Sequence, residues 1–137
     1  MTFDDGFASA AKSGKKVFID VYTDWCTWCK KMDKDVYPDS VVVRLMSSKF
    51  AAIKLNAEGS LPITFHGTKL SEAQFARSVG ISSYPTTLFL ESDGKPISIV
   101  PGYLPATRFS DVLVFFAEEH YKRGTFQEFL KRSKSQP

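Results

Sequence analysis

The sequence predicts an α/β fold in which a mixed central β-sheet is flanked by helices on both faces and followed by an extra C-terminal helix. Two apolar runs, at 16–22 and 50–55, alternate with segments of helical periodicity, which is typical of parallel strands joined by a crossover. A turn signal, Ser-Asp-Gly-Lys at 92–95, separates two further runs at 86–91 and 96–100. Those two strands are therefore expected to be antiparallel neighbours.

Length and composition indicate one globular domain over residues 1–137, with its core at about 16–121 and the additional helix at about 125–134. The formal charge of +3, from 18 Lys and Arg against 15 Asp and Glu, is too small and dispersed for a nucleic-acid-binding surface. Basic residues near the C-terminus fit a solvated helix face, or a weak attraction for an acidic partner. The longest apolar runs fall far short of the roughly 20 residues of a membrane span.

Four elements are expected before the second strand. Helical spacing of apolar residues predicts a first helix over about 2–14. The run 16–22 has the composition of a buried central strand and is interrupted by one acid, Asp20. Good helix formers at 27–36 end at Tyr-Pro-Asp, and a capped helix follows over about 39–47.

The segment 56–69 is polar, contains glycine and has no period, so a loop is expected there. Such a loop is long for a compact domain, and it is either a functional surface or mobile. A capping box at 71–74 predicts the next helix, which ends at Gly80. After the two hairpin strands, an amphipathic helix is expected up to about residue 121, and a second capping box at 125–128 begins the last helix.

The two cysteines, Cys26 and Cys29, are spaced Cys-x-x-Cys at the junction of the first strand and a helix. A spacing of three on a helix puts both side chains on one face, close enough for a disulfide. Cys26 lies at the helix N-terminus, where free N–H groups and the helix dipole lower a thiol pKa, so it is predicted to be the nucleophile. Cys29, one turn further in and more buried, is predicted to resolve the mixed disulfide.

The cysteine pair has two other interpretations. Half of a zinc site needs further ligands, but the only imidazoles, His66 and His120, lack zinc-finger spacing. A purely structural disulfide that closes so short a loop would restrict the unfolded chain little. Redox exchange is therefore favoured, and neither a metal nor a cofactor is expected.

Several ordered motifs resemble one family. The stretch 18–30, Phe-Ile-Asp-Val-Tyr-Thr-Asp-Trp-Cys-Thr-Trp-Cys-Lys, resembles the active-site strand and helix of thioredoxins, and the resemblance continues at 54–56, 80–86 and 93–102. It covers roughly 16–118 and is closest to proteins similar to the C-terminal domain of DsbD and to bacterial disulfide isomerases. The resemblance implies a thioredoxin fold and a thiol:disulfide oxidoreductase of the protein disulfide reductase or isomerase type.

The resemblance also implies roles for charged residues near the cysteines. Asp20 matches the buried carboxylate of the family, and its pKa should be raised so that it exchanges a proton with Cys29. Lys54 matches the lysine that approaches this acid. The alternatives are a capped structural acid and a solvated lysine.

Residues expected to bind the partner are aromatic or lie in the proline loop. Pro85 matches the cis-proline of the family, which leaves the backbone of Tyr84 free to pair with a substrate chain. A trans proline at a strand start is the alternative. Trp25 and Trp28 are expected to form a rim for an apolar partner segment, unless they belong to the core.

Departures from the family pattern bear on function. Thioredoxins carry Gly-Pro where this chain has Thr27 and Trp28, so their reduction potential does not transfer. The 56–69 loop and the final helix are additional and could select a partner. A non-catalytic module that binds a partner through Trp28, Tyr84 and this loop is the alternative to an enzyme.

The expected partners are protein thiols or disulfides and an upstream redox protein, and the chain is expected to be a monomer. Residues 1–14 offer neither the basic n-region nor the apolar h-region of a secretory signal. The sequence is compatible with a cytoplasmic protein and with an exported, periplasmic protein whose signal has been removed. The second location is favoured.

Overall fold

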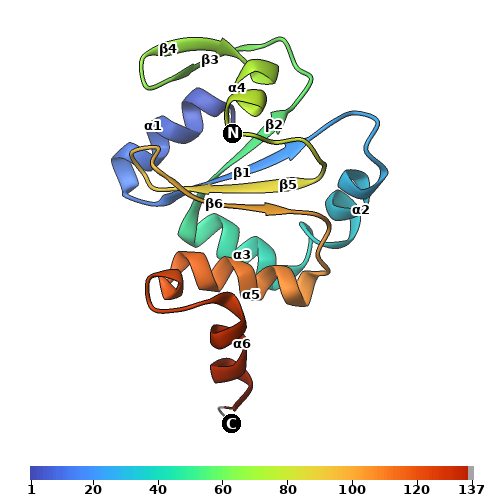
Figure 1. Ribbon diagram of the computed structural model, residues 1–137, viewed down its shortest axis with the longest axis vertical. Helices are drawn as coiled ribbons and strands as arrows, with labels where there is room; N and C mark the ends of the chain where they lie inside the picture. The colour runs from blue at the N-terminus through green and yellow to red at the C-terminus, as the bar shows by residue number, and fades with distance from the viewer. Residues whose placement is uncertain (136–137) are drawn as a thin grey trace.

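The computed structural model describes residues 1–135 and is built around a four-stranded sheet of order β2-β1-β5-β6 (Figure 1). β1 is parallel to β2 and antiparallel to β5, and β5 is antiparallel to β6. The mixed central sheet predicted from the sequence is therefore confirmed. Its strands are β1 (Lys16–Tyr22), β2 (Phe50–Asn56), β5 (Thr86–Leu90) and β6 (Pro96–Pro101).

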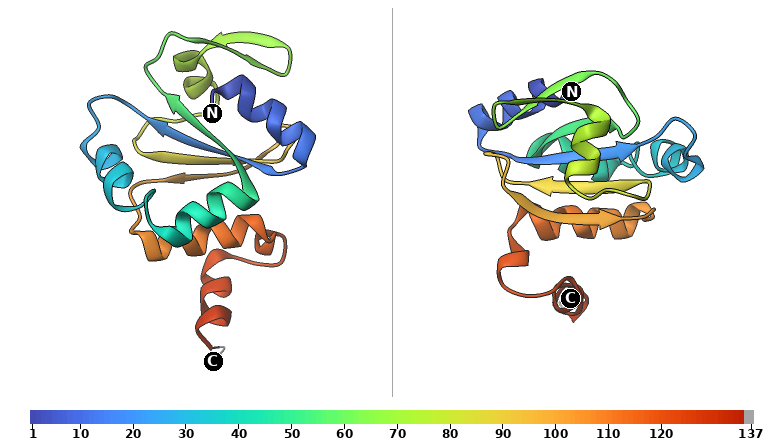
Figure 2. Two further views of the ribbon diagram at one scale, coloured as in Figure 1. Left: turned by 180° about the vertical axis from the view of Figure 1, so that it is seen from behind. Right: turned by 45° about the horizontal axis from the view of Figure 1, so that its top comes forward.

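Helices cover both faces of this sheet, as expected (Figures 1 and 2). One face packs against α1, α4 and a small hairpin, and the other packs against α2, α3 and α5. The last helix, α6, projects away from the sheet beyond α5. The helices are α1 (Phe3–Ser13), α2 (Thr27–Asp35), α3 (Ser40–Lys49), α4 (Glu72–Ser78), α5 (Ala106–Ala117), a 3-10 turn (His120–Lys122) and α6 (Phe126–Ser135). No helix within the described residues is both long and apolar enough to cross a membrane.

Alternation along β1 decides which of its side chains reach the site. Val17, Ile19 and Val21 belong to the core beneath α1 and α4, whereas Phe18 belongs to the core beneath α3 and α5. Because successive strand residues point to opposite faces, Asp20 shares the face of Phe18. The central strand thus carries its one acid toward the side of the sheet where α2 begins.

The caps predicted for α1, α4 and α6 are present in the structure. The N-cap Thr2 accepts a hydrogen bond from the backbone of Asp5 at 3.2 Å, and Gly14 adopts φ 74° at the end of α1. Both capping boxes, at 71–74 and at 125–128, are reciprocal. These local signals place the helix ends because they satisfy N–H groups that a helix leaves unpaired.

Two expectations of the sequence are wrong. The segment 56–69, expected as a loop, contains β3 (Pro62–Phe65), which pairs antiparallel with β4 (Thr68–Ser71) across a His66-Gly67 turn in which both residues have positive φ. This hairpin lies outside the main sheet and is held by packing on α1 and α4, which local sequence does not reveal. The helix expected up to about residue 121 ends at Ala117, because Glu119 turns the chain with φ 60°.

Candidate active site

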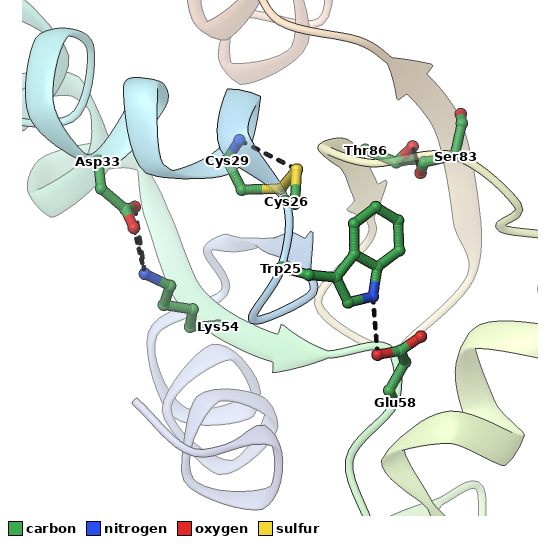
Figure 3. Close-up of a disulfide and its surroundings, with 8 residues drawn as sticks. All are labelled: Trp25, Cys26, Cys29, Asp33, Lys54, Glu58, Ser83 and Thr86. Atoms are coloured by element: carbon green, nitrogen blue, oxygen red, sulfur yellow. Dashed lines mark hydrogen bonds and ion pairs between the residues drawn. A yellow bond between two sulfur atoms is a disulfide. The ribbon is translucent and has the colours of Figure 1, made fainter.

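The two cysteines meet at the beginning of α2, where the sequence predicts them. Cys26 is the N-cap residue, and its sulfur is joined to that of Cys29 in a disulfide, with the Cα atoms 5.3 Å apart (Figure 3). The sulfur of Cys26 also accepts a hydrogen bond from the backbone N–H of Cys29 at 3.1 Å. A thiolate at Cys26 would therefore face the N–H groups and the positive end of the helix dipole.

Exposure does not distinguish the two cysteines. Cys26 is 4% exposed and Cys29 is 5% exposed, so the greater exposure predicted for Cys26 is absent in the disulfide form. The disulfide joins the two sulfurs, and both cysteines are buried. The assignment of Cys26 as nucleophile then depends on its position at the helix N-terminus, and it stays a prediction.

Asp20 lies on β1, the strand that leads into the cysteine turn, and is 8% exposed. Burial raises the pKa of its carboxyl group from 3.8 to about 6, while the positive charge of Lys54 opposes this rise and the negative charge of Asp33 adds to it. The hydroxyl group of Tyr37 faces Asp20 and also lowers its pKa, although this buried oxygen makes no hydrogen bond of standard geometry with described residues. A carboxylate with a pKa near 6 can accept or return a proton near neutral pH.

Lys54 forms its ion pair with a different acid from the one expected, Asp33 instead of Asp20. Its ammonium nitrogen lies 3.1 Å from both carboxylate oxygens of Asp33 (Figure 3). It also lies 4.9 Å from the ring centre of Tyr22. Lys54 acts on Asp20 through its charge, with no direct hydrogen bond. Asp33 was not singled out as an acid of the site, although its spacing of four from Cys29 puts both on one face of α2.

The proline loop leads into the start of β5 and faces the cysteines (Figure 3). The Tyr84–Pro85 peptide bond is cis, as the resemblance to thioredoxins implied. The carbonyl of Pro85 accepts a hydrogen bond from Gly102 at 2.8 Å, and the hydroxyl of Thr86 donates to the carbonyl of Ser83 at 2.6 Å. These bonds fix the loop next to the disulfide.

Two pairs of aromatic side chains flank the disulfide. Trp25 is 63% exposed and Trp28 is 55% exposed, so both belong to a surface rim and not to the core. The ring of Trp25 lies edge-on to that of Tyr84 at 5.9 Å, and Trp28 packs against Tyr103 at 5.2 Å. Sequence reasoning missed Tyr103, whose only signal was its place after a strand end in the family-like segment.

A cavity of about 230 Å³ opens beside Cys29. It is lined by Tyr22, Thr23, Asp24, Cys29, Lys30, Asp33 and Lys54. Polar side chains therefore surround the space next to the inner cysteine. No group of three or more His, Cys, Asp or Glu side chains in residues 1–135 is arranged to hold a metal ion.

Comparison with known proteins identifies relatives. A family model described as a thioredoxin-like domain matches residues 3–117. The thiol:disulfide interchange protein DsbD of Pseudoalteromonas atlantica is 31% identical over 110 residues, which are 79% of this chain and 17% of that protein. DsbD of Photorhabdus laumondii is 32% identical over 103 residues, or 74% of this chain and 16% of that protein. The chain thus spans about a sixth of the length of these curated relatives.

Solved structures show the same fold. A thioredoxin-fold protein from Helicobacter pylori superposes with a TM-score of 0.72 at 22% identity, covering 89% of this chain and 81% of that one. The reduced C-terminal domain of DsbD from Neisseria meningitidis superposes with a TM-score of 0.62 at 19% identity, covering 79% and 87%. At such identities the likeness establishes the fold alone, and the predicted thioredoxin fold is confirmed.

Proposed function

The chain belongs to the thioredoxin-like family, and we propose that it is a thiol:disulfide oxidoreductase that exchanges a disulfide between Cys26, Cys29 and a protein partner. The observation that carries the proposal is the disulfide at the N-terminus of α2, which directly follows the strand that carries a buried acid with a raised pKa, Asp20. Neither an idle cysteine pair nor a structural disulfide needs a buried acid with a raised pKa on the preceding strand.

The first step is the attack of Cys26 on the partner. Its thiolate forms a new bond to one sulfur of the partner disulfide, the old S–S bond breaks, and the leaving sulfur takes up a proton. The sulfur of Cys26 accepts the N–H of Cys29 at 3.1 Å, so the same donor can stabilise the thiolate. This supports Cys26 as the nucleophile.

The second step releases the partner. Cys29 loses its proton to the carboxylate of Asp20 and attacks the sulfur of Cys26, which closes the intramolecular disulfide and frees the second partner thiol. A pKa of about 6 leaves Asp20 mostly ionised at pH 7, so it is ready to accept that proton. Lys54, paired with Asp33, is proposed to tune this pKa and not to transfer the proton itself.

The aromatic rim is proposed to hold the partner chain across the disulfide. Trp25 and Tyr84 form one side, Trp28 forms the other, and the backbone next to Pro85 can pair with an extended segment. Exposed aromatic side chains of this kind are typical of sites that bind apolar segments.

Those exposed aromatic side chains also suit a second candidate, a module that binds a partner without redox turnover. Insulin reduction with dithiothreitol as electron donor separates the two proposals. The enzyme accelerates precipitation of the insulin B chain above the rate with dithiothreitol alone, whereas the binding module leaves that rate unchanged.

The decisive experiment replaces one cysteine at a time. Cys29→Ser should still attack but not resolve, so covalent complexes with partner proteins accumulate and disappear when dithiothreitol is added. Cys26→Ser is the matched control and should trap nothing. If the Cys29→Ser protein yielded no reducible adducts while the wild type reduced insulin, the assignment of nucleophile and resolver would be wrong.

We further propose that the chain acts as a monomer in an oxidising compartment such as the bacterial periplasm, with protein thiols and an upstream redox protein as partners. The exposed rim beside the disulfide supports a protein partner. Fractionation of cells, with acid quenching and alkylation of free thiols, tests the compartment and the redox state together. Recovery of the protein with cytoplasmic markers would contradict this proposal.

A further inference from the structure

The turn that follows β2 is held rigidly beside the active site. Within it, the backbone N–H groups of Glu58 and Gly59 donate to the side chain and the carbonyl of Asn56, each at 3.0 Å. The buried carboxylate of Glu72 accepts the N–H of Asn56 at 3.1 Å and packs directly against Gly59. The position of Glu58 is therefore fixed by the fold and not by its own side chain.

This turn places the carboxylate of Glu58 against the residue that precedes the nucleophile. One oxygen, Oε1, accepts the indole N–H of Trp25 at 2.9 Å (Figure 3). The same indole lies edge-on to the ring of Tyr84. Glu58 is exposed and makes no ion pair within residues 1–135. Its second oxygen, Oε2, therefore remains available at the mouth of the site.

Charges are divided across this mouth. Glu58 is an exposed acid beside the first tryptophan, Trp25, whereas Asp24 lines the cavity beside Cys29 together with Lys30 and Lys54. Cations lie on the opposite side: Lys30 is exposed on α2, and Lys31 and Lys54 are in ion pairs with acids of α2. No described cation neutralises Glu58, so the first side presents negative charge next to an open aromatic face.

An arginine or lysine side chain is the partner group that fits both features. A guanidinium or ammonium group can bind Oε2 of Glu58 in a charge-assisted hydrogen bond while it lies over the indole of Trp25. We propose that Glu58 determines specificity, selecting partner segments that carry Arg or Lys next to the reacting cysteine. The inference rests on the proposed function, since the bound segment must bring its disulfide to Cys26.

The test compares disulfide-linked peptides that differ only in the residue beside the cysteine, Arg or Glu. The wild type should reduce the Arg peptide with a kcat/KM about three- to tenfold higher, and the preference should shrink between about 0.05 and 0.5 M salt. Glu58→Gln keeps an acceptor for the indole but removes the charge, so the preference should fall below about twofold. Glu58→Lys should reverse the preference, so that the Glu peptide is reduced with the higher kcat/KM.

Asp93→Asn is the matched control, because it also exchanges an exposed carboxylate for an amide, at the hairpin turn between β5 and β6. It should keep the preference of the wild type. An unchanged preference in Glu58→Gln, or an equal loss in Asp93→Asn, would overturn the proposal.

A binding measurement separates this inference from the proposed function. Peptides with serine in place of cysteine are titrated into a Trp28→Phe protein, so that fluorescence reports Trp25 alone. A preference for Arg that disappears with Glu58→Gln, in a protein without turnover, would retain the specificity and reject the redox function. Turnover without any preference for the Arg peptide would retain the redox function and reject the specificity.

Discussion

Asp20→Asn should make the protein more stable at neutral pH while slowing its reaction. The carboxyl group of Asp20 is 8% exposed, and burial raises its pKa from 3.8 to about 6. The folded state therefore binds the proton more tightly than the unfolded state does. Stability contributed by this group is fully present below pH 3.8 and is lost as the pH rises through about 6.

The size of the effect follows from the pKa. A rise from 3.8 to about 6 corresponds to about 3 kcal/mol, at about 1.4 kcal/mol for each pKa unit. Asparagine carries no charge to bury, but its amide must find hydrogen-bond partners, which offsets about 1 kcal/mol. At pH 8 the Asp20→Asn protein should therefore be more stable by about 2 kcal/mol, and the advantage should vanish near pH 4.

Urea unfolding of the oxidised proteins between pH 4 and pH 8 measures this difference. Asp93→Asn makes the same exchange at an exposed acid, so it is the control and should not show the stabilisation at pH 8. Insulin reduction by Asp20→Asn should be slower at pH 7, because no carboxylate accepts the proton of Cys29. A stability difference between Asp20→Asn and wild type that does not change with pH would refute the reasoning.

Three further predictions concern the surroundings of the site and the core. Lys54→Met removes a positive charge that lowers the pKa of Asp20, so the midpoint of the pH–rate profile should move to higher pH. Gly59→Ala places a methyl group against the carboxylate of Glu72 and should destabilise the protein by about 1–3 kcal/mol in urea. Phe89→Ala leaves a cavity in a fully buried core position and should cost about 3–5 kcal/mol by the same measurement.

Elements with strong local signals could be predicted closely from the sequence. The bounds of β1 match the apolar run 16–22, because a strand with neighbours on both edges and helices on both faces is apolar almost throughout. The caps of α1 and α4 are set by side chains within three residues of the helix start. Neither feature depends on distant parts of the chain.

The β3–β4 hairpin could not be found in the same way. Each of its strands has four residues, and Ile63 is the only buried side chain in them. Its turn uses His66 and Gly67, both with positive φ, instead of the Asn-Gly or Asp-Gly that signals such a turn. The hairpin forms because α1 and α4 offer an apolar surface, which is a tertiary cause.

The candidate site also contains both features that local sequence predicts and contacts that it does not predict. The cysteine pair, the buried acid and the proline loop were visible as motifs of neighbouring residues. The pairing of Lys54 with Asp33 and the bond from Trp25 to Glu58 join residues 21 and 33 positions apart. Only the register of β2 beside β1 brings these partners together, and no local pattern encodes it.

That register also explains why the buried acid can remain partly charged. β1 pairs Asp20 directly with Lys54 on β2, so a lysine is fixed at the neighbouring strand position while its ammonium group reaches Asp33 on α2. The positive charge lowers the pKa of Asp20, and the negative charge of Asp33 limits that effect. Three elements therefore hold this pKa near 6, and moving any one of them would shift the pH at which Cys29 can give up its proton.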